Sequence, residues 1–222
     1  MSAENYRERR TFDPCMRRRS FISSALGAGA GLVSSAALAR RAQAGAKRPR
    51  DRRTYDEIKE VNAALLGELF AAPDPSWRPW QWLVVHHTAA EHASLAGIDR
   101  YHRNHFGDPY GAEYHFVINN GKRGALGLVE AARWRHQELA AHLFHPERAP
   151  ESLALCLIGN FEARAVPEAM MDALASLSRA LMSTFAIPIE RVTTHREIDG
   201  RLTQCPGKHF DLADLKARIG AP

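Results

Sequence analysis

The chain has 222 residues, 45% of them hydrophobic, and a net charge of +5, which suits one globular domain with additional segments. Of its 30 basic and 25 acidic residues, residues 1–44 hold 8 and 3, which leaves 22 of each in residues 45–222. The larger part of the chain is therefore neutral, which argues against a nucleic-acid-binding protein.

Residues 1–44 have the features of an export signal. The pair Arg18-Arg19, with Phe21 shortly after it, fits the twin-arginine pattern. Residues 22–39 are only mildly apolar and are interrupted by Ser and Gly, so they make a poor membrane anchor. A small-x-small cleavage pattern runs from Ala42 to Ala44. We expect twin-arginine export to the periplasm or another extracytoplasmic site, without a stable membrane anchor; the alternative is a basic, disordered tail.

Residues 45–79 are expected to form a linker and an accessory helix. A basic stretch, residues 47–53, precedes a segment from Tyr55 to Phe70 in which apolar residues recur at helical spacing. Three prolines follow this segment and end the helix. The helix either packs on the domain or stands apart as an accessory segment, and the sequence leaves both open.

Residues 80–222 alternate between strand and helix patterns. This alternation predicts an α/β or α+β domain with a single mixed β-sheet flanked by helices. The sequence shows no internal repeat and no transmembrane span. Strands are expected at 82–88, 114–119, 125–130, 152–161 and 191–194, and helices at 95–106, 167–185 and 211–219.

Histidine and cysteine residues mark a candidate metal site. The apolar first strand ends in His86 and His87, and open α/β sheets place their chemistry at the C-terminal ends of strands. Far downstream, His195 follows a short strand, and Cys205 lies in the turn Thr-Gln-Cys-Pro-Gly. One imidazole from each segment and one thiolate supply three nitrogen and sulfur ligands. Three protein ligands plus a water is the arrangement of catalytic zinc.

Five motifs occur in the order and spacing seen in the zinc-dependent N-acetylmuramoyl-L-alanine amidases. The chain resembles the type 2 domains of these enzymes, which are relatives of the peptidoglycan recognition proteins and of phage T7 lysozyme. The resemblance covers roughly residues 80–212, and five motifs in register are more specific than any one alone. The motifs are VVHHTA, EYHFVINN, SLALCLIGNF, VTTHREI and TQCPG.

The resemblance implies an activity and a cofactor. It implies hydrolysis of the amide bond between N-acetylmuramic acid and L-alanine of the peptidoglycan stem peptide, with Zn²⁺ bound and with peptidoglycan or muropeptides as substrates. It also identifies His86, the first histidine after the apolar run, as a ligand and His87 as a neighbour on the substrate side. His195 and Cys205 match the second and third ligands. The sequence leaves the oligomeric state open.

Catalytic groups besides the metal follow from the same resemblance. Tyr114 matches a tyrosine beside the metal that donates to the attacking water or to the oxyanion; the alternative is a core aromatic. Its neighbour His115 should face the other side of the strand. Thr203 stands where some branches carry Lys, and its hydroxyl can donate one hydrogen bond but cannot neutralise charge. The third strand carries no glutamate base, which some relatives have, so water activation falls to the metal.

Further residues are assigned to the substrate side or to the core. By resemblance, His142, Arg133 and Trp134 line the substrate groove. Cys156, within an apolar strand, is expected to be a buried, inert thiol, since a nucleophilic thiol needs exposure and activation. A disulfide between Cys156 and Cys205 would destroy the proposed metal site.

Two alternatives to this amidase remain. The first is a non-catalytic peptidoglycan-binding module of the same fold. Such relatives usually lack a ligand, often the cysteine, and here all three positions are filled, which favours catalysis. The second is a zinc hydrolase that acts on another amide, and only a substrate assay distinguishes it from an N-acetylmuramoyl-L-alanine amidase.

Overall fold

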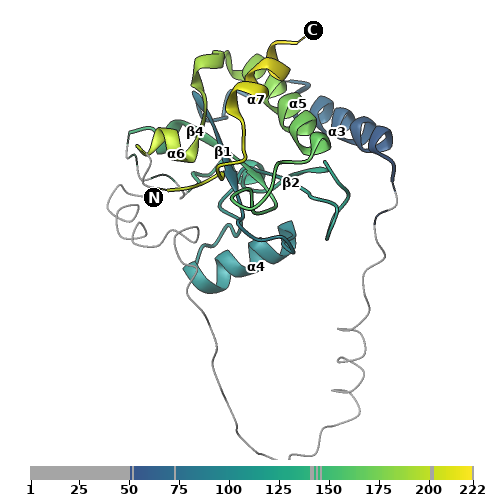
Figure 1. Cartoon of the computed structure of the whole chain (residues 1–222). Coiled ribbons are helices and arrows are strands. Elements are labelled where there is room, and N and C mark those ends of the chain that lie inside the picture. The colour runs from purple at the N-terminus through teal and green to yellow at the C-terminus, as the bar shows by residue number, and fades with distance from the viewer. Residues whose placement is uncertain are drawn as a thin grey trace, which may run out of the picture.

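The computed structural model describes residues 51, 53–72, 74–140, 143, 145, 147–200 and 203–221 (Figure 1). The expected export signal, residues 1–44, and the expected substrate residue His142 lie outside the described residues. Within the described part, no helix has the length and apolar character needed to cross a membrane.

A mixed five-stranded sheet forms the centre of the domain, in the order β3-β2-β4-β1-β5 (Figure 1). Strands β2, β4, β1 and β5 run parallel, and β3 pairs antiparallel with β2. This arrangement confirms the single mixed sheet that the sequence predicts. The strands are β1 Trp82–His87, β2 Phe116–Ile118, β3 Val129–Ala131, β4 Ser152–Leu157 and β5 Val192–Thr194.

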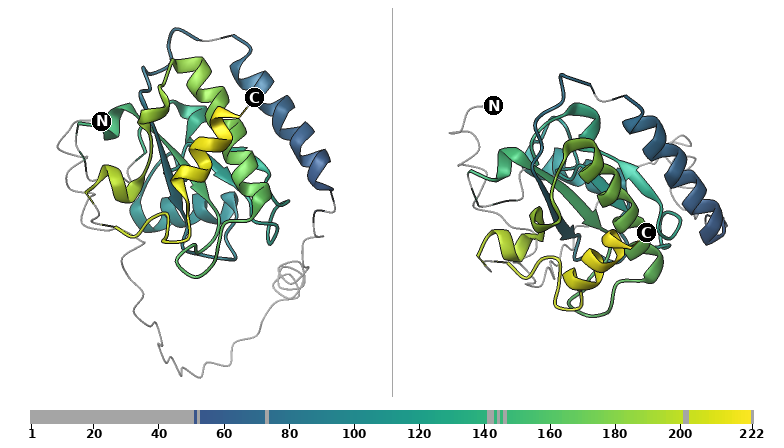
Figure 2. Two further views of the ribbon diagram at one scale, coloured as in Figure 1. Left: turned by 45° about the horizontal axis from the view of Figure 1, so that its top comes forward. Right: turned by 90° about the horizontal axis from the view of Figure 1, so that it is seen from above.

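Helices cover both faces of the sheet. In two views, α5 lies across one face with α3 and α7 beside it, whereas α4 lies on the opposite side (Figures 1 and 2). The helices are α3 Tyr55–Phe70, α4 Leu95–Phe106, α5 Glu168–Phe185, α6 His195–Ile198 and α7 Leu212–Gly220, with short 3-10 helices at Arg133–His136, Ala149–Glu151 and Ile189–Arg191.

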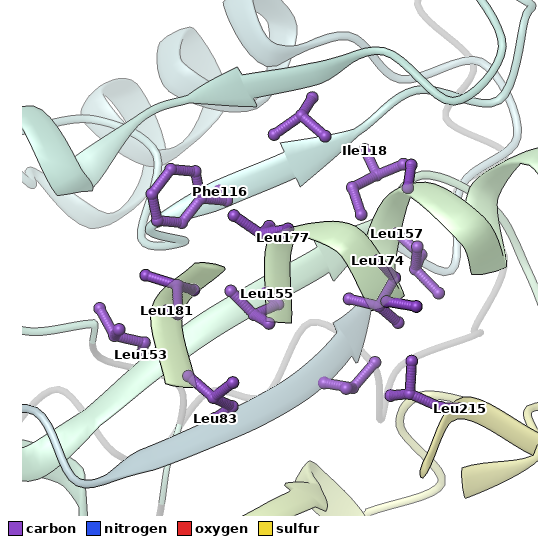
Figure 3. Close-up of a cluster of buried hydrophobic side chains, with 14 of the residues drawn as sticks. Leu83, Phe116, Ile118, Leu153, Leu155, Leu157, Leu174, Leu177, Leu181 and Leu215 are labelled. Carbon is purple, nitrogen blue, oxygen red and sulfur yellow. The ribbon is translucent and has the colours of Figure 1, made fainter. Parts of the chain in front are cut away.

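Alternate residues of β4 face two separate cores. Leu153, Leu155 and Leu157 belong to the core beneath α5 (Figure 3), because successive side chains of a strand point to opposite faces. Ala154 and Cys156 belong to the smaller core on the α4 side. Burial on both faces explains why this strand is apolar throughout. Cys156 is fully buried, as expected, and no disulfide joins it to Cys205.

Helix α5 supplies the largest part of the main core. Its residues Met170, Leu174, Leu177 and Leu181, all fully buried, recur every three or four positions and form a stripe along the helix that faces the sheet. Figure 3 shows the leucines of this stripe over the strands, among them Leu174, Leu177 and Leu181. The helical spacing noted in the sequence therefore identifies both the helix and its buried face.

Three strands are at least three residues shorter than the sequence predicts, and in two of them side chains replace backbone partners. The predicted strand 152–161 ends at Leu157: the Ile158 N–H still donates to the Ile118 carbonyl, but the Gly159 and Asn160 N–H groups donate to side chains of the segment after β1. The predicted strand 114–119 begins only at Phe116, since the Ala154 N–H donates to the His115 ring instead of a carbonyl. The hairpin partner predicted at 125–130 is β3, which is shorter and begins only at Val129, because residues 125–128 form a turn in which the Leu128 N–H donates to the Ala125 carbonyl.

Helix α3 packs on the domain, which settles the alternative that the sequence leaves open. Its N-terminus has a capping box, in which Thr54 and Glu57 bond reciprocally. Tyr55 donates a hydrogen bond to Asp172 of α5. Asn62 is buried: its amide donates to the Gly127 carbonyl and accepts from the Val129 N–H, each at 2.9 Å.

Asn62→Ala should destabilise the domain, because it leaves the Gly127 carbonyl and the Val129 N–H without their partner. A buried unsatisfied group costs about 1–3 kcal/mol. Urea unfolding of the variant checks this, with Glu60→Ala on the exposed face of α3 as the control. Equal stability of the two variants would show that the hydrogen bonds of Asn62 contribute little to the fold.

Candidate functional site

The sheet topology brings distant histidines to one edge. Strands β1 and β5 pair in parallel, with Val85 opposite Thr194. His86 follows Val85 in β1, and His195 directly follows the last residue of β5, so both lie at the C-terminal edge of the sheet. His195 is also the first residue of α6, whose N-cap Thr194 accepts a hydrogen bond from the Glu197 N–H.

His86, His195 and Cys205 form a compact buried cluster. One nitrogen or sulfur atom from each residue lies within 4.8 Å of the others. The His86 Nδ1 lies 3.8 Å from the Cys205 Sγ, and the two imidazole centroids are 4.7 Å apart. All three residues are no more than 2% exposed. The structure therefore brings together the three residues that the sequence selects as zinc ligands.

Neighbouring groups orient two members of the cluster. The His195 Nε2 bonds the Asp199 carboxylate at 2.9 Å, and this carboxylate also accepts from the His145 N–H at 3.0 Å. A carboxylate partner holds the proton on Nε2 and makes Nδ1 the nitrogen that can bind a metal. The backbone N–H of His87 donates to the Cys205 sulfur at 3.3 Å, which orients the sulfur within the cluster.

Asp199 is a site residue that the sequence reasoning missed. The sequence contained a signal for it, because Asp199 follows His195 by four residues and residues at this spacing are neighbours on a helix.

His102 was also missed as a site residue: its Nδ1 accepts from the Glu113 N–H at 3.1 Å. Burial, and then the charge of Arg133, lower the pKa of His102 to about 4, so its ring is neutral at neutral pH.

The two adjacent histidines of β1 have different surroundings. His86 faces the cluster, whereas the Nδ1 of His87 accepts a hydrogen bond from the Phe161 N–H at 3.3 Å. Successive strand residues point to opposite faces, which explains the difference. The structure thus places His86 in the cluster and His87 outside it, and the assignment of His86 as a metal ligand stays a prediction.

The turn that carries Cys205 is fixed by close packing. The Cys205 N–H donates to the Thr203 hydroxyl oxygen at 3.2 Å, so buried Thr203 helps to position the cysteine. The peptide bond from Cys205 to Pro206 is cis. Gly207 has φ +108°, and a Cβ there would lie 2.4 Å from the carbonyl carbon of Phe161. The backbone of this turn therefore touches the loop after β4, and only glycine fits at the contact.

A groove of about 950 Å³ borders the cluster. Tyr114 lines the groove, and its ring centroid lies 5.8 Å from that of His86. His87 and Gln204, each next in sequence to a cluster residue, line it as well. The other lining residues come from the β1–α4 loop, α4, the β2–β3 loop and the β4–α5 loop; they include His92, Arg100, Tyr101, His102, Arg123, Asn160 and Glu162.

Arg133 and Trp134, expected to line the groove, lie inside the domain instead. Arg133 pairs with Asp108 at 2.8 Å, and both side chains are at most 4% exposed. Its guanidinium also donates to the carbonyls of Gly111, Ala112 and Leu139. Trp134 packs in the main core, with its ring against Phe116 and other aromatics. The ion pair and hydrogen bonds give Arg133 a structural place, and packing in the core does the same for Trp134.

Gly207→Ala should lower the free energy of unfolding more than Gly200→Ala does. Both glycines have positive φ, but a Cβ at Gly200 meets no atom within 4 Å. The difference therefore isolates the clash with Phe161, and such overpacking costs about 1–3 kcal/mol. Urea unfolding of the two variants checks this, and equal losses would mean that the Cys205 turn can shift without cost.

Comparisons with known proteins agree with this geometry. A family model described as N-acetylmuramoyl-L-alanine amidase matches residues 76–208. A search of curated proteins finds no match.

Solved structures give the same result. N-acetylmuramoyl-L-alanine amidase LysC from Clostridium intestinale URNW is 26% identical, with a TM-score of 0.55 over 65% of this chain and 87% of that one. Endolysine N-acetylmuramoyl-L-alanine amidase LysCS from the same organism is also 26% identical, with a TM-score of 0.54 over 68% and 91%. PGRP-SA of Apis mellifera shares the fold at 20% identity, with a TM-score of 0.51 over 60% and 79%. The chain therefore belongs to the N-acetylmuramoyl-L-alanine amidase family.

Proposed function

We propose that this protein is a zinc-dependent amidase that cleaves the bond between N-acetylmuramic acid and L-alanine of the peptidoglycan stem peptide. The observation that carries the proposal is the buried cluster of His86, His195 and Cys205 beside an open groove. Family membership and the two amidases from Clostridium intestinale support the same reaction.

The residues present fit a zinc ion. Two imidazoles and one thiolate are ligands that Zn²⁺ prefers, and three protein ligands leave a fourth position for water or substrate. The bond from Asp199 to His195 is the kind of outer partner that metal-bound histidines have. Zinc bound there would lower the pKa of water to about 7 and polarise the substrate carbonyl.

The protein's own groups hold the substrate and stabilise charge. The groove orients the glycan and the peptide so that the scissile carbonyl faces the cluster. Tyr114, between His86 and the groove, donates a hydrogen bond from its phenol to the developing oxyanion. Thr203 acts mainly by holding Cys205, since its hydroxyl oxygen accepts the Cys205 N–H. The amine released is the nitrogen of L-alanine.

Recognition without cleavage is the competing function. The likeness to PGRP-SA of Apis mellifera concerns the fold alone. A recognition module needs no metal ligands. In this chain, three residues that can bind a metal are buried together, and hydrogen bonds orient two of them, His195 and Cys205. The observed geometry therefore favours catalysis.

Incubation with peptidoglycan tests the reaction directly. The purified protein should release stem peptides that begin with L-alanine, and a chelator should abolish the release until Zn²⁺ is restored. Mass spectrometry of the products identifies the bond. Products cut elsewhere, or release that a chelator does not affect, would overturn the proposal.

Cys205→Ala should lose most bound zinc and all measurable activity, because two imidazoles alone make a weak site. Cys205→Asp should keep part of both, since a carboxylate is an accepted zinc ligand. Cys156→Ala is the matched control: it removes a buried thiol from β4 and should keep zinc and activity. Elemental analysis and muropeptide release are measured for all three variants. Full zinc content in Cys205→Ala would end the ligand assignment.

Tyr114→Phe should keep the fold and the zinc but lower kcat. Loss of one oxyanion donor costs about 10²–10³ in rate. The control is Tyr55→Phe, which removes a phenol on α3 that bonds Asp172. Steady-state kinetics on a soluble N-acetylmuramoyl peptide separate the two variants. Parent-like kcat in Tyr114→Phe would show that this ring only packs.

A further inference from the structure

Glu91, in the loop between β1 and α4, binds groups from two other loops. Its carboxylate lies 3.0 Å from the Lys122 Nζ and 3.2 Å from the Arg164 Nε. It also accepts the backbone N–H of Asn160 at 3.2 Å. The Glu91 carbonyl accepts from the side-chain amide of Asn120 at 3.0 Å. One residue therefore joins the β1–α4, β2–β3 and β4–α5 loops.

Each of these loops contributes to the wall of the groove. In the sequence, Glu91 lies between two residues that line the groove. Each of the two cations that it binds is also next in sequence to a residue that lines the groove. Asn160, whose N–H it accepts, lines the groove itself. The flanking residues that line the groove are Ala90, His92, Arg123 and Ala163.

The β4–α5 loop depends on this segment for its backbone hydrogen bonds. Three consecutive N–H groups, starting just after Ile158, donate to side chains of the last residue of β1 and of the segment that follows it. Glu91 accepts the middle one, and Thr88 and His87 accept the others. No strand pairs with this stretch, so these side chains fix its position.

The charge of Glu91 is part of the arrangement. Burial raises the pKa of Glu91, but Lys122, the Asn160 N–H and Arg164 together outweigh burial and hold the pKa below its usual range. The same loop keeps Ala89 in the left-handed region, at φ 51°. A non-glycine residue stays there only where its surroundings hold it.

We propose that Glu91 is a positioning residue, an ionic clamp that fixes the three loops and thereby sets the shape of the groove that binds the muropeptide. The clamp rests on the proposed function, because it assumes that the groove holds this substrate. Glu91 does not belong to the metal cluster, so its contribution is to substrate binding.

Glu91→Gln removes the charge and nearly preserves the shape of the side chain. KM for a soluble N-acetylmuramoyl peptide should rise about 3- to 30-fold, as expected for the loss of two part-exposed ion pairs. The kcat and the zinc content should stay at the parent values. The control is Glu168→Gln, which removes an ion pair with Arg218 away from the groove and should leave KM unchanged. A fall in kcat at constant KM would overturn the clamp.

Coupling between the partners separates a clamp from direct contact with substrate. Lys122→Gln and Arg164→Gln should each raise KM in the parent protein but add little in Glu91→Gln, because the clamp is already broken. If either substitution has its full effect in both backgrounds, that cation binds substrate itself and the clamp is overturned.

Hydrogen exchange tests the clamp independently of activity. In Glu91→Ala the amides of residues 159–161 should exchange faster than in the parent, while amides of β4 keep their protection. Unchanged exchange would overturn the clamp even if the enzyme is active. If the parent protein releases no muropeptide, the proposed function fails, and the exchange result still decides whether Glu91 holds the loops.

Discussion

The site depends on the contact between the loop after β4 and two distant segments. Phe161 donates its N–H to His87 and accepts from the His209 N–H at 3.0 Å. Glu162 accepts from the Lys208 N–H at 2.7 Å. The loop therefore joins the end of β1 to the Cys205 turn, which is 119 residues away from His86 along the chain. The His87 N–H and the Arg196 N–H also bond Cys205 directly, so this bridge and these two bonds together bring the cysteine to the two histidines.

The parallel strands explain why the two histidines of the cluster, His86 and His195, meet. β1 pairs with both β4 and β5, so its C-terminal end has neighbours on each side. His195 comes directly after β5, and Asp199 one helical turn later holds its ring. Strand alternation then directs His86 into the cluster with His195 and Cys205, and His87 toward the loop after β4. His86 and His87 therefore have different surroundings because successive side chains of a strand point to opposite faces.

The sequence predicted the family, the mixed sheet and the proximity of His86, His195 and Cys205, because motifs and periodicity are local properties. It did not identify Glu91, whose partners lie on other loops. It placed Trp134 in the groove, whereas tertiary packing puts it in the core. Resemblance transfers the position of a residue but not the direction of its side chain, and hydrogen bonds between distant segments leave no periodic pattern.

Helix α3 precedes the part of the chain that the family model matches, yet its Asn62 satisfies the outer edge of β3. The Leu128 carbonyl accepts from the N–H of Asn119, the residue that follows β2, and therefore points toward β2. Because neighbouring peptide groups of an extended chain point in opposite directions, the Gly127 carbonyl and the Val129 N–H point away from the sheet. Such an exposed edge is a template for a strand from another molecule. A polypeptide shortened to the matched region would present that template to its own copies. By covering these two backbone groups, α3 removes part of the free edge that such pairing needs.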